Sequence, residues 1–172
     1  MTLPISNPPI DTPIRLRLPT AEDGAAVHEL IARCTPLDRN SLYCNLLQCS
    51  LFSSTCVLAE RHGQAVGFIS GFIEPQQPDC LFIWQVAVAA EARGLGLART
   101  MLMELVRRPI CQDITQLQTS ITEHNTASWA LFKSLARQLQ AELTQQVLFD
   151  RQHHLNDQHP TEVLVTISRF AA

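Results

Sequence analysis

The chain has 172 residues, of which 46% are hydrophobic and 17% are charged, and its formal net charge is −3. No run of like charges occurs, so we expect neither a nucleic-acid surface nor a membrane-attracting face, and a small molecule is the favoured partner. No stretch approaches about 18 consecutive apolar residues, and the first residues lack the basic start and apolar core of a signal peptide. We therefore expect a cytoplasmic protein.

Four prolines fall within the first 13 residues, which predicts an irregular leader over residues 1–13 and a single domain over residues 14–170. The cysteines form no Cys-x-x-Cys pair and most lie in apolar runs, so we expect buried thiols rather than disulfides or a zinc site. His153-His154 has no third ligand at a useful spacing, so no metal is expected. The six cysteines are Cys34, Cys44, Cys49, Cys56, Cys80 and Cys111.

The first elements after the leader are predicted from period and capping signals. Ile14–Leu18 alternates apolar and basic residues with a period of two, as a half-buried edge strand does. Thr20 with Asp23 three residues on resembles a capping box, and the apolar residues that follow predict a helix. This helix should end before Pro36.

A second helix and a hairpin are predicted next. Either Asn40 or Ser41 can cap the helix, which carries several leucines. Thr55–Arg61 and Gln64–Ile73 have the character of strands, and the turn residues His62-Gly63 join them as a hairpin.

The rest of the sequence alternates turn signals with apolar segments of strand or helix period. We predict a turn at Pro75–Asp79, a strand at Leu81–Val88, a helix from near Ala98 to about Arg107 that ends before Pro109, a strand at Ile114–Ile121, a helix at Asn125–Gln140, a further paired segment at Gln145–Phe149, a polar loop at Asp150–Pro160 and a strand at Val163–Ile167. This order predicts a mixed sheet covered by helices, which is an α/β or α+β class.

The turn Arg93-Gly94-Leu95-Gly96-Leu97-Ala98 carries the clearest chemical signal, because it joins an apolar strand to a helix. Small residues let the unpaired amides of a helix N-terminus approach an anion, and the helix dipole adds positive potential there. Arg93 can add a bidentate phosphate contact. A dinucleotide site is disfavoured because Arg99 stands where a third small residue is needed, and the Gly-Lys-Ser/Thr of a P-loop is absent. A plain strand-to-helix connection remains the structural alternative.

The order of elements and the pattern Arg93-x-x-Gly96-x-Ala98 resemble the Gcn5-related N-acetyltransferases, which bind acetyl-coenzyme A (acetyl-CoA). The resemblance spans about residues 14–132 and implies a mixed, mostly antiparallel sheet of about seven strands flanked by about four helices. It implies that Gln85-Val86-Ala87-Val88 pairs through its backbone with the pantetheine arm, and that an N–H of this strand binds the oxyanion of the intermediate. Asn125-x-x-Ser128-x-x-Leu131-Phe132 resembles the second cofactor-binding motif, with Phe132 where many members carry a Tyr.

Four longer stretches give a more specific signal than the glycine turn: residues 36–49, Phe68-Ile69-Ser70-Gly71, residues 82–88 and His159-Pro160-Thr161-Glu162-Val163-Leu164. These stretches resemble a narrower family, the L-2,4-diaminobutyrate acetyltransferases of ectoine biosynthesis. This resemblance implies transfer of an acetyl group from acetyl-CoA to the γ-amino group of L-2,4-diaminobutanoate, by a homodimer.

Direct transfer requires an uncharged amine, whereas a side-chain amine of this kind titrates near about 10.4, so a base must remove a proton. Glu162 and His159 are the candidate bases, and Tyr43 is a third catalytic candidate. Outside the resemblance, His159 is a solvated loop residue and Glu162 an exposed charge at a strand start. Cys44 and Cys49 lack a recognisable Cys-His-Asn constellation, so direct transfer is favoured over a covalent acetyl-enzyme.

The acceptor carries two ammonium groups and one carboxylate, so an acidic residue and polar donors should line its site. The resemblance assigns Asp38, Asn40 and Tyr43 to this role together with Glu162, and Trp84 offers a cation–π face. From their pattern alone, Asp38 is a turn residue, Tyr43 a packing residue and Trp84 a core residue. Two alternatives stay open: an acetyltransferase for another small amine, and a non-catalytic acetyl-CoA-binding module.

Overall fold

A seven-stranded sheet forms the centre of the structure, a computed structural model that describes residues 13–168. The strand order is β1-β2-β3-β4-β5-β7-β6, and each neighbouring pair is antiparallel except β4–β5. The strands are β1 (Arg15–Arg17), β2 (Val57–Arg61), β3 (Gln64–Glu74), β4 (Gln77–Val88), β5 (Gln116–Thr122), β6 (Glu142–Phe149) and β7 (Glu162–Ser168). The expected mixed, mostly antiparallel sheet is confirmed. The predicted leader lies outside the described residues except for Pro13, as does the end of the predicted domain beyond residue 168.

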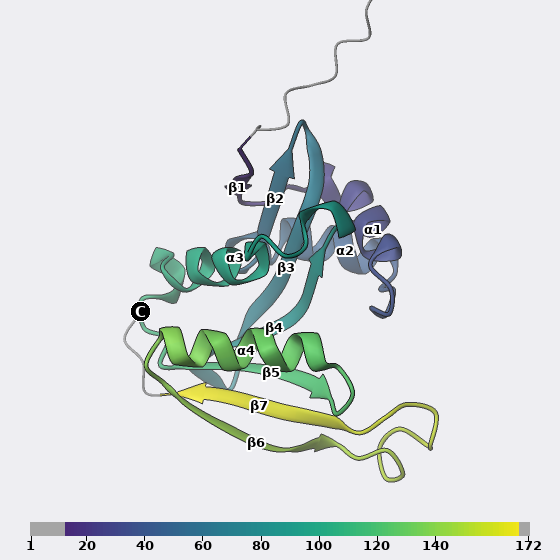
Figure 1. Ribbon diagram of the computed structural model, residues 1–172, viewed down its shortest axis with the longest axis vertical. Coiled ribbons are helices and arrows are strands. Elements are labelled where there is room, and N and C mark those ends of the chain that lie inside the picture. Colours follow the sequence, from purple (N-terminus) through teal and green to yellow (C-terminus); the bar gives the residue numbers. More distant parts are fainter. Residues whose placement is uncertain (1–12, 169–172) are drawn as a thin grey trace, which may run out of the picture.

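Two pairs of helices cover the sheet, with α3 and α4 on one face and α1 and α2 on the other (Figure 1). In the described part of the chain the α-helices are α1 (Gly24–Arg33), α2 (Leu42–Ser50), α3 (Leu97–Val106) and α4 (Thr126–Gln138). Single 3₁₀ turns lie at Ala21–Asp23, Ser53–Thr55, Ala90–Ala92 and Pro109–Cys111. Among residues 13–168, no helix is both long enough and apolar enough to cross a membrane.

Side-chain caps explain where the helices begin. The Thr20 N–H donates to Asp23 Oδ2 at 2.7 Å, which confirms the capping box, and a 3₁₀ turn then leads into α1. Ser41 rather than Asn40 caps α2, because its hydroxyl oxygen accepts the N–H of Cys44 at 3.1 Å. Asn125 caps α4 in the same way.

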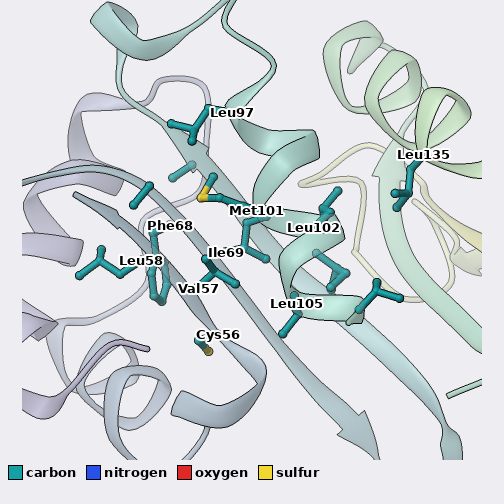
Figure 2. Close-up of a cluster of buried hydrophobic side chains, with 14 of the residues drawn as sticks. Cys56, Val57, Leu58, Phe68, Ile69, Leu97, Met101, Leu102, Leu105 and Leu135 are labelled. Carbon is teal, nitrogen blue, oxygen red and sulfur yellow. The ribbon is translucent and has the colours of Figure 1, made fainter. Parts of the chain in front are cut away.

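The main core lies between α3 and the strands β2 and β3. Figure 2 shows Met101 and Leu105 of α3 beside Val57 and Ile69, which are opposite each other in the two strands. Gly67 lets the helix approach, since a Cβ at that position would lie 2.9 Å from the Met101 methyl group. All six cysteines are free thiols, and the expected burial is confirmed for all of them except Cys44, which is half-buried in the first turn of α2.

Several predicted boundaries differ from the structure by one or two residues, as at Thr55, Ile114 and Gln140, and two were wrong by more than that. The expected turn at Pro75–Asp79 is shorter, because Glu74 pairs with Gln77 and β4 begins there; the register then shifts, and Pro78 lies in that irregularity, where a proline is tolerated. β6 begins at Glu142 rather than Gln145, because its polar residues pair with β7 through the backbone and leave no apolar alternation to detect.

The parallel contact between β4 and β5 is short. It runs from Cys80 opposite Gln116 to Ile83 opposite Thr119. Beyond these residues β4 continues to Val88 and β5 to Thr122, each still paired on its other side. The two strands therefore diverge in the middle of the sheet and leave an opening between them.

Candidate active site

The opening between β4 and β5 exposes one backbone edge of β4. Trp84 is an extra residue in this strand, since Ser70 pairs with Gln85 and Gly71 with Ile83, so β4 bulges where it leaves β5. From Gln85 to Val88 the edge that faces β5 has no strand partner in the described register. Such an edge can hydrogen-bond an extended ligand.

The turn after β4 has the geometry of an anion site. Gly94 and Gly96 adopt φ values of +76° and +72°, a conformation that L-residues with side chains rarely take. Gly96 is the N-cap of α3, so the amides of the first turn of that helix have no partner within the helix. No atom lies within 4 Å of a Cβ built at Gly94, so the turn is open on that side.

The side chains of the predicted cofactor residues divide into three groups. Gln85 and Leu97 are buried, Val86, Val88 and Ala98 are half-buried, and Arg93 and Leu95 are exposed. Because the Leu97 side chain is buried, this residue can bind a ligand only through its backbone N–H. Arg93 is the charged side chain of the turn, and its Nε donates to the carbonyl oxygen of Val88 at 3.1 Å.

The second segment that the sequence predicts to bind the cofactor lies at the start of α4. Asn125 Oδ1 accepts the N–H of Ser128 at 3.1 Å, so one end of this amide is used to cap the helix. Phe132 is 2% exposed and belongs to the hydrophobic core. Phe132, where many family members carry a Tyr, therefore packs against apolar side chains and has no hydroxyl group to offer a ligand.

The connection between α1 and α2 brings the predicted acceptor residues against β4. Asn40 Nδ2 donates to Gln85 Oε1 at 2.9 Å, and Gln85 Nε2 donates to the Asp38 carbonyl oxygen at 2.9 Å. The side chains of Asp38 and Tyr43 are exposed. Sequence reasoning missed the Gln85 side chain, because a Gln in an apolar strand gives no signal of a partner 45 residues away.

Trp84 faces the same side of the sheet as these residues. Its ring meets Phe72 edge-on, with centroids 6.3 Å apart. Phe72 lies two residues beyond Ser70, which pairs with Gln85, so all of these side chains project to the α1–α2 side. Trp84 is 47% exposed, which excludes the core position that its pattern alone favoured.

Glu162 is at the start of β7, opposite Thr122 at the end of β5, on the other side of the opening. Its neighbour Val163 lines a groove together with Trp129 and Lys133 of α4. Successive strand residues project to opposite faces, so Glu162 projects to the α1–α2 side, as Trp84 does. His159 is exposed in the loop before β7.

A groove with a volume of about 980 Å³ lies between α4, β6 and the loop before β7. Neither Trp84 nor the glycine turn lines it. The chemistry of the residues beside the opening between β4 and β5 makes that opening the candidate active site. No group of three or more His, Cys, Asp or Glu side chains suited to a metal occurs among residues 13–168.

Comparison with known proteins identifies the fold and the class of site. Residues 24–136 match the model of the acetyltransferase (GNAT) family, and the chain belongs to this family. An L-2,4-diaminobutyric acid acetyltransferase from Methylotuvimicrobium alcaliphilum is 54% identical over 159 residues, which cover 92% of each chain. One from Vibrio cholerae is 49% identical over 88% of this chain and 87% of its own.

Solved structures agree. The diaminobutyrate acetyltransferase EctA from Paenibacillus lautus, in complex with its substrate L-2,4-diaminobutyric acid and coenzyme A, superposes with a TM-score of 0.89. It is 37% identical and the match covers 94% of this chain and 98% of that one. The ribosomal-protein-S18-alanine N-acetyltransferase from Escherichia coli, at 15% identity and a TM-score of 0.67 over 92% and 96% of the two chains, shares the fold alone.

Proposed function

We propose that this chain transfers the acetyl group of acetyl-CoA to the γ-amino group of L-2,4-diaminobutanoate, in the biosynthesis of ectoine. The observation that carries the proposal is the 54% identity, over 92% of both chains, to a protein named L-2,4-diaminobutyric acid acetyltransferase. The fold of the P. lautus enzyme, determined with diaminobutyric acid and coenzyme A, supports it.

Acetyl-CoA fits the site on the α3 side of the sheet. The positive-φ glycines of the turn hold the first amides of α3 open to a pyrophosphate, and Arg93 supplies charge. The β4 edge from Gln85 to Val88 pairs with the pantetheine arm, and Asn125 contributes from α4. An N–H of β4 near Val86 stabilises the oxyanion, a contribution of roughly 3 kcal/mol for one such donor.

The acceptor binds on the opposite face, and the two substrates meet through the opening. Asp38 attracts an ammonium group, Asn40 and Tyr43 add polar contacts, and Trp84 offers its ring face to a cation. Glu162, on the far side of the opening, completes the acidic environment that a diamino acid requires.

The reaction needs three proton transfers, because the amine nitrogen loses two protons and the sulfur gains one. Glu162 or His159, directly or through a water, takes a proton from the γ-ammonium group, and the freed amine attacks the thioester carbonyl carbon. The nitrogen of the tetrahedral intermediate is positively charged and loses its second proton to the base or to water. As the intermediate collapses, the C–S bond breaks and the thiolate takes up a proton. Phe132 cannot supply it, and Tyr43 is the only phenol in the chain, which makes Tyr43 the candidate acid.

We further propose a single catalytic domain over residues 14–170 that works as a homodimer in the cytoplasm. The free thiols suit a reducing compartment. Sedimentation of the purified protein at several concentrations tests the dimer.

The function is tested by incubating purified protein with acetyl-CoA and diaminobutanoate and locating the acetyl group by NMR. We expect the γ-acetyl product. Acetylation at the α-amino group, or faster turnover of another small amine, would contradict the proposal, and tight acetyl-CoA binding without transfer to any amine would indicate a binding module instead. Glu162→Gln and His159→Ala then separate the two candidate bases, since only loss of the true base should flatten the rise of kcat/KM with pH.

A further inference from the structure

The side chain of Gln85 is used at both ends. Its Oε1 accepts a hydrogen bond from Asn40 Nδ2 and its Nε2 donates to the Asp38 carbonyl oxygen, each at 2.9 Å. The residue is 9% exposed, so water competes little for either bond. A primary amide is required at this position, because one end must accept and the other must donate.

The partners of Gln85 lie in the segment that carries the candidate acceptor residues. Asp38 and Asn40 belong to the connection between α1 and α2, and Tyr43 follows in the first turn of α2. Cys34, at the start of this connection, also contacts the sheet, through its thiol and the Val88 carbonyl oxygen at 3.4 Å. The Gln85 bonds fix the part of the connection nearest to the exposed Asp38 and Tyr43 side chains.

The backbone of Gln85 belongs to the other half of the site. The residue follows directly after the Trp84 bulge, at the start of the β4 edge that faces the opening. One residue therefore joins the strand beside the acetyl group to the segment that holds the acceptor. A displacement of about 1 Å between two reactants can lower a rate by roughly a hundredfold.

We propose that Gln85 is a positioning residue whose side chain sets the distance between the acceptor segment, residues 38–43, and the acetyl group held along β4, and thereby the choice of the γ-amino group. The inference rests on the proposed function. It assigns Gln85 a part in acceptor selectivity, in addition to the backbone role in cofactor binding.

Two variants separate this role from a general loss of structure. Gln85→Met keeps the length of the side chain and removes both hydrogen bonds, whereas Gln85→Glu keeps the acceptor for Asn40 and loses the donor to Asp38. Gln48→Met is the matched control, because Gln48 is also a buried glutamine, bonded within α2 to Asn45.

The experiment measures KM and kcat for both substrates, the α to γ product ratio, the Kd for acetyl-CoA and the Tm of each variant. We expect Gln85→Met to raise the KM for diaminobutanoate by about tenfold or more and to increase the α-acetyl product, with the Kd for acetyl-CoA within about twofold of wild type. The acceptor KM of Gln85→Glu should lie between those of wild type and Gln85→Met. Gln48→Met should change only the Tm.

A double-mutant cycle covers the case in which Gln85→Met is too unstable to assay. Asn40→Ala removes one of the two bonds. Combining it with Gln85→Glu should raise the acceptor KM by more than the product of the two single effects, because Gln85→Glu keeps the bond with Asn40 and the double variant leaves its buried carboxylate without a donor. Equal loss of affinity for both substrates, an unchanged acceptor KM, or additive effects would overturn the inference. If wild type prefers another amine, the proposed function fails, and the same comparison with that amine tests Gln85 independently.

Discussion

Arg93 Nε donates a 3.1 Å hydrogen bond to the carbonyl oxygen of Val88, so the turn that we propose to bind phosphate is bonded back to the last residue of β4. A guanidinium group can keep this bond and still offer its terminal nitrogens to a phosphate, because its five N–H donors are spread over three nitrogens. A lysine has one nitrogen for both tasks.

Arg93→Ala should therefore raise the Kd for acetyl-CoA by roughly 10- to 100-fold, since hydrogen bonds to charged groups contribute about 1.5–3 kcal/mol. Arg93→Lys should lie between this variant and wild type. Isothermal titration calorimetry with coenzyme A measures the effect. Arg107→Ala, a change at an exposed arginine just beyond the other end of α3, is the control, and an equal loss there would show that only the overall charge matters.

Gly96 and Gly63 share the same backbone conformation at different places in the fold. Their φ values are +72° and +73°, and neither has a crowding atom at the position of a Cβ. Alanine at either position should lower stability by roughly 1–2 kcal/mol. Only Gly96→Ala should also weaken acetyl-CoA binding, because Gly63 lies in the β2–β3 hairpin. Thermal denaturation with and without coenzyme A checks both, and similar affinities in the two variants would refute the anion site.

An ion cluster of Arg17, Asp23 and Glu60 should make the free energy of unfolding fall as the pH becomes acidic. Arg17 bonds Asp23 at 2.7 Å and Glu60 at 2.9 Å, and the hydrogen bond from Arg17 lowers the pKa of Asp23 despite partial burial. A lowered carboxyl pKa stabilises the fold above the unfolded value of about 3.9, and this contribution is lost as pH falls through the folded value. Asp23→Asn should cost roughly 2 kcal/mol near neutral pH.

The difference between wild type and Asp23→Asn should then shrink as the pH falls below about 4. Urea denaturation at several pH values measures it. Glu22→Gln, an exposed neighbour in the same 3₁₀ turn, serves as control and should show no such difference. A gap between wild type and Asp23→Asn that stays constant down to pH 3 would exclude the ion cluster as its cause.

The six cysteine thiols should react with a thiol reagent at different rates. Burial raises the pKa of Cys49 to about 12 and those of Cys56, Cys80 and Cys111 to about 11, so at pH 8 only about one thiol in a thousand or fewer is ionised at these positions. Cys34 is buried too, which leaves the half-buried Cys44 as the fastest to react. Titration with a thiol reagent should show one fast group in the native protein and six in guanidinium.

Cys44→Ser should abolish the fast phase and keep kcat, as direct transfer requires. An acetylated cysteine detected by mass spectrometry during turnover, with loss of activity in this variant, would instead establish a covalent intermediate.

The sequence predicts those parts of the molecule that depend on local pattern. The hairpin of β2 and β3, the glycine turn and α3 follow from alternation, positive-φ residues and a helical period, each within a few neighbouring residues. Pro78 misled the prediction because only the register shift between β3 and β4 makes it tolerable. The prediction made β6 too short because the first residues of this strand pair through the backbone and show no apolar alternation.

The acceptor side was harder to predict, because its geometry depends on residues far apart in the chain. Trp84 was assigned to substrate binding from family likeness, but its place in a bulge depends on the pairing of Ser70 with Gln85. The contact of Asn40 with Gln85 likewise spans 45 positions and needs the whole α1–α2 layer to form. Periodicity within one segment carries no information about such contacts.

The divergence of β4 from β5 beyond Ile83 has a consequence for stability if acetyl-CoA pairs with the open edge as proposed. A ligand that pairs with the open edge acts as an inserted strand, and at a concentration one hundred times its Kd it adds about 2.7 kcal/mol to the free energy of unfolding. Amides from Gln85 to Val88 that face the gap should then exchange with deuterium slowly in the complex and quickly without it. On this proposal, a shortage of acetyl-CoA in the cell would make the enzyme easier to unfold and to degrade.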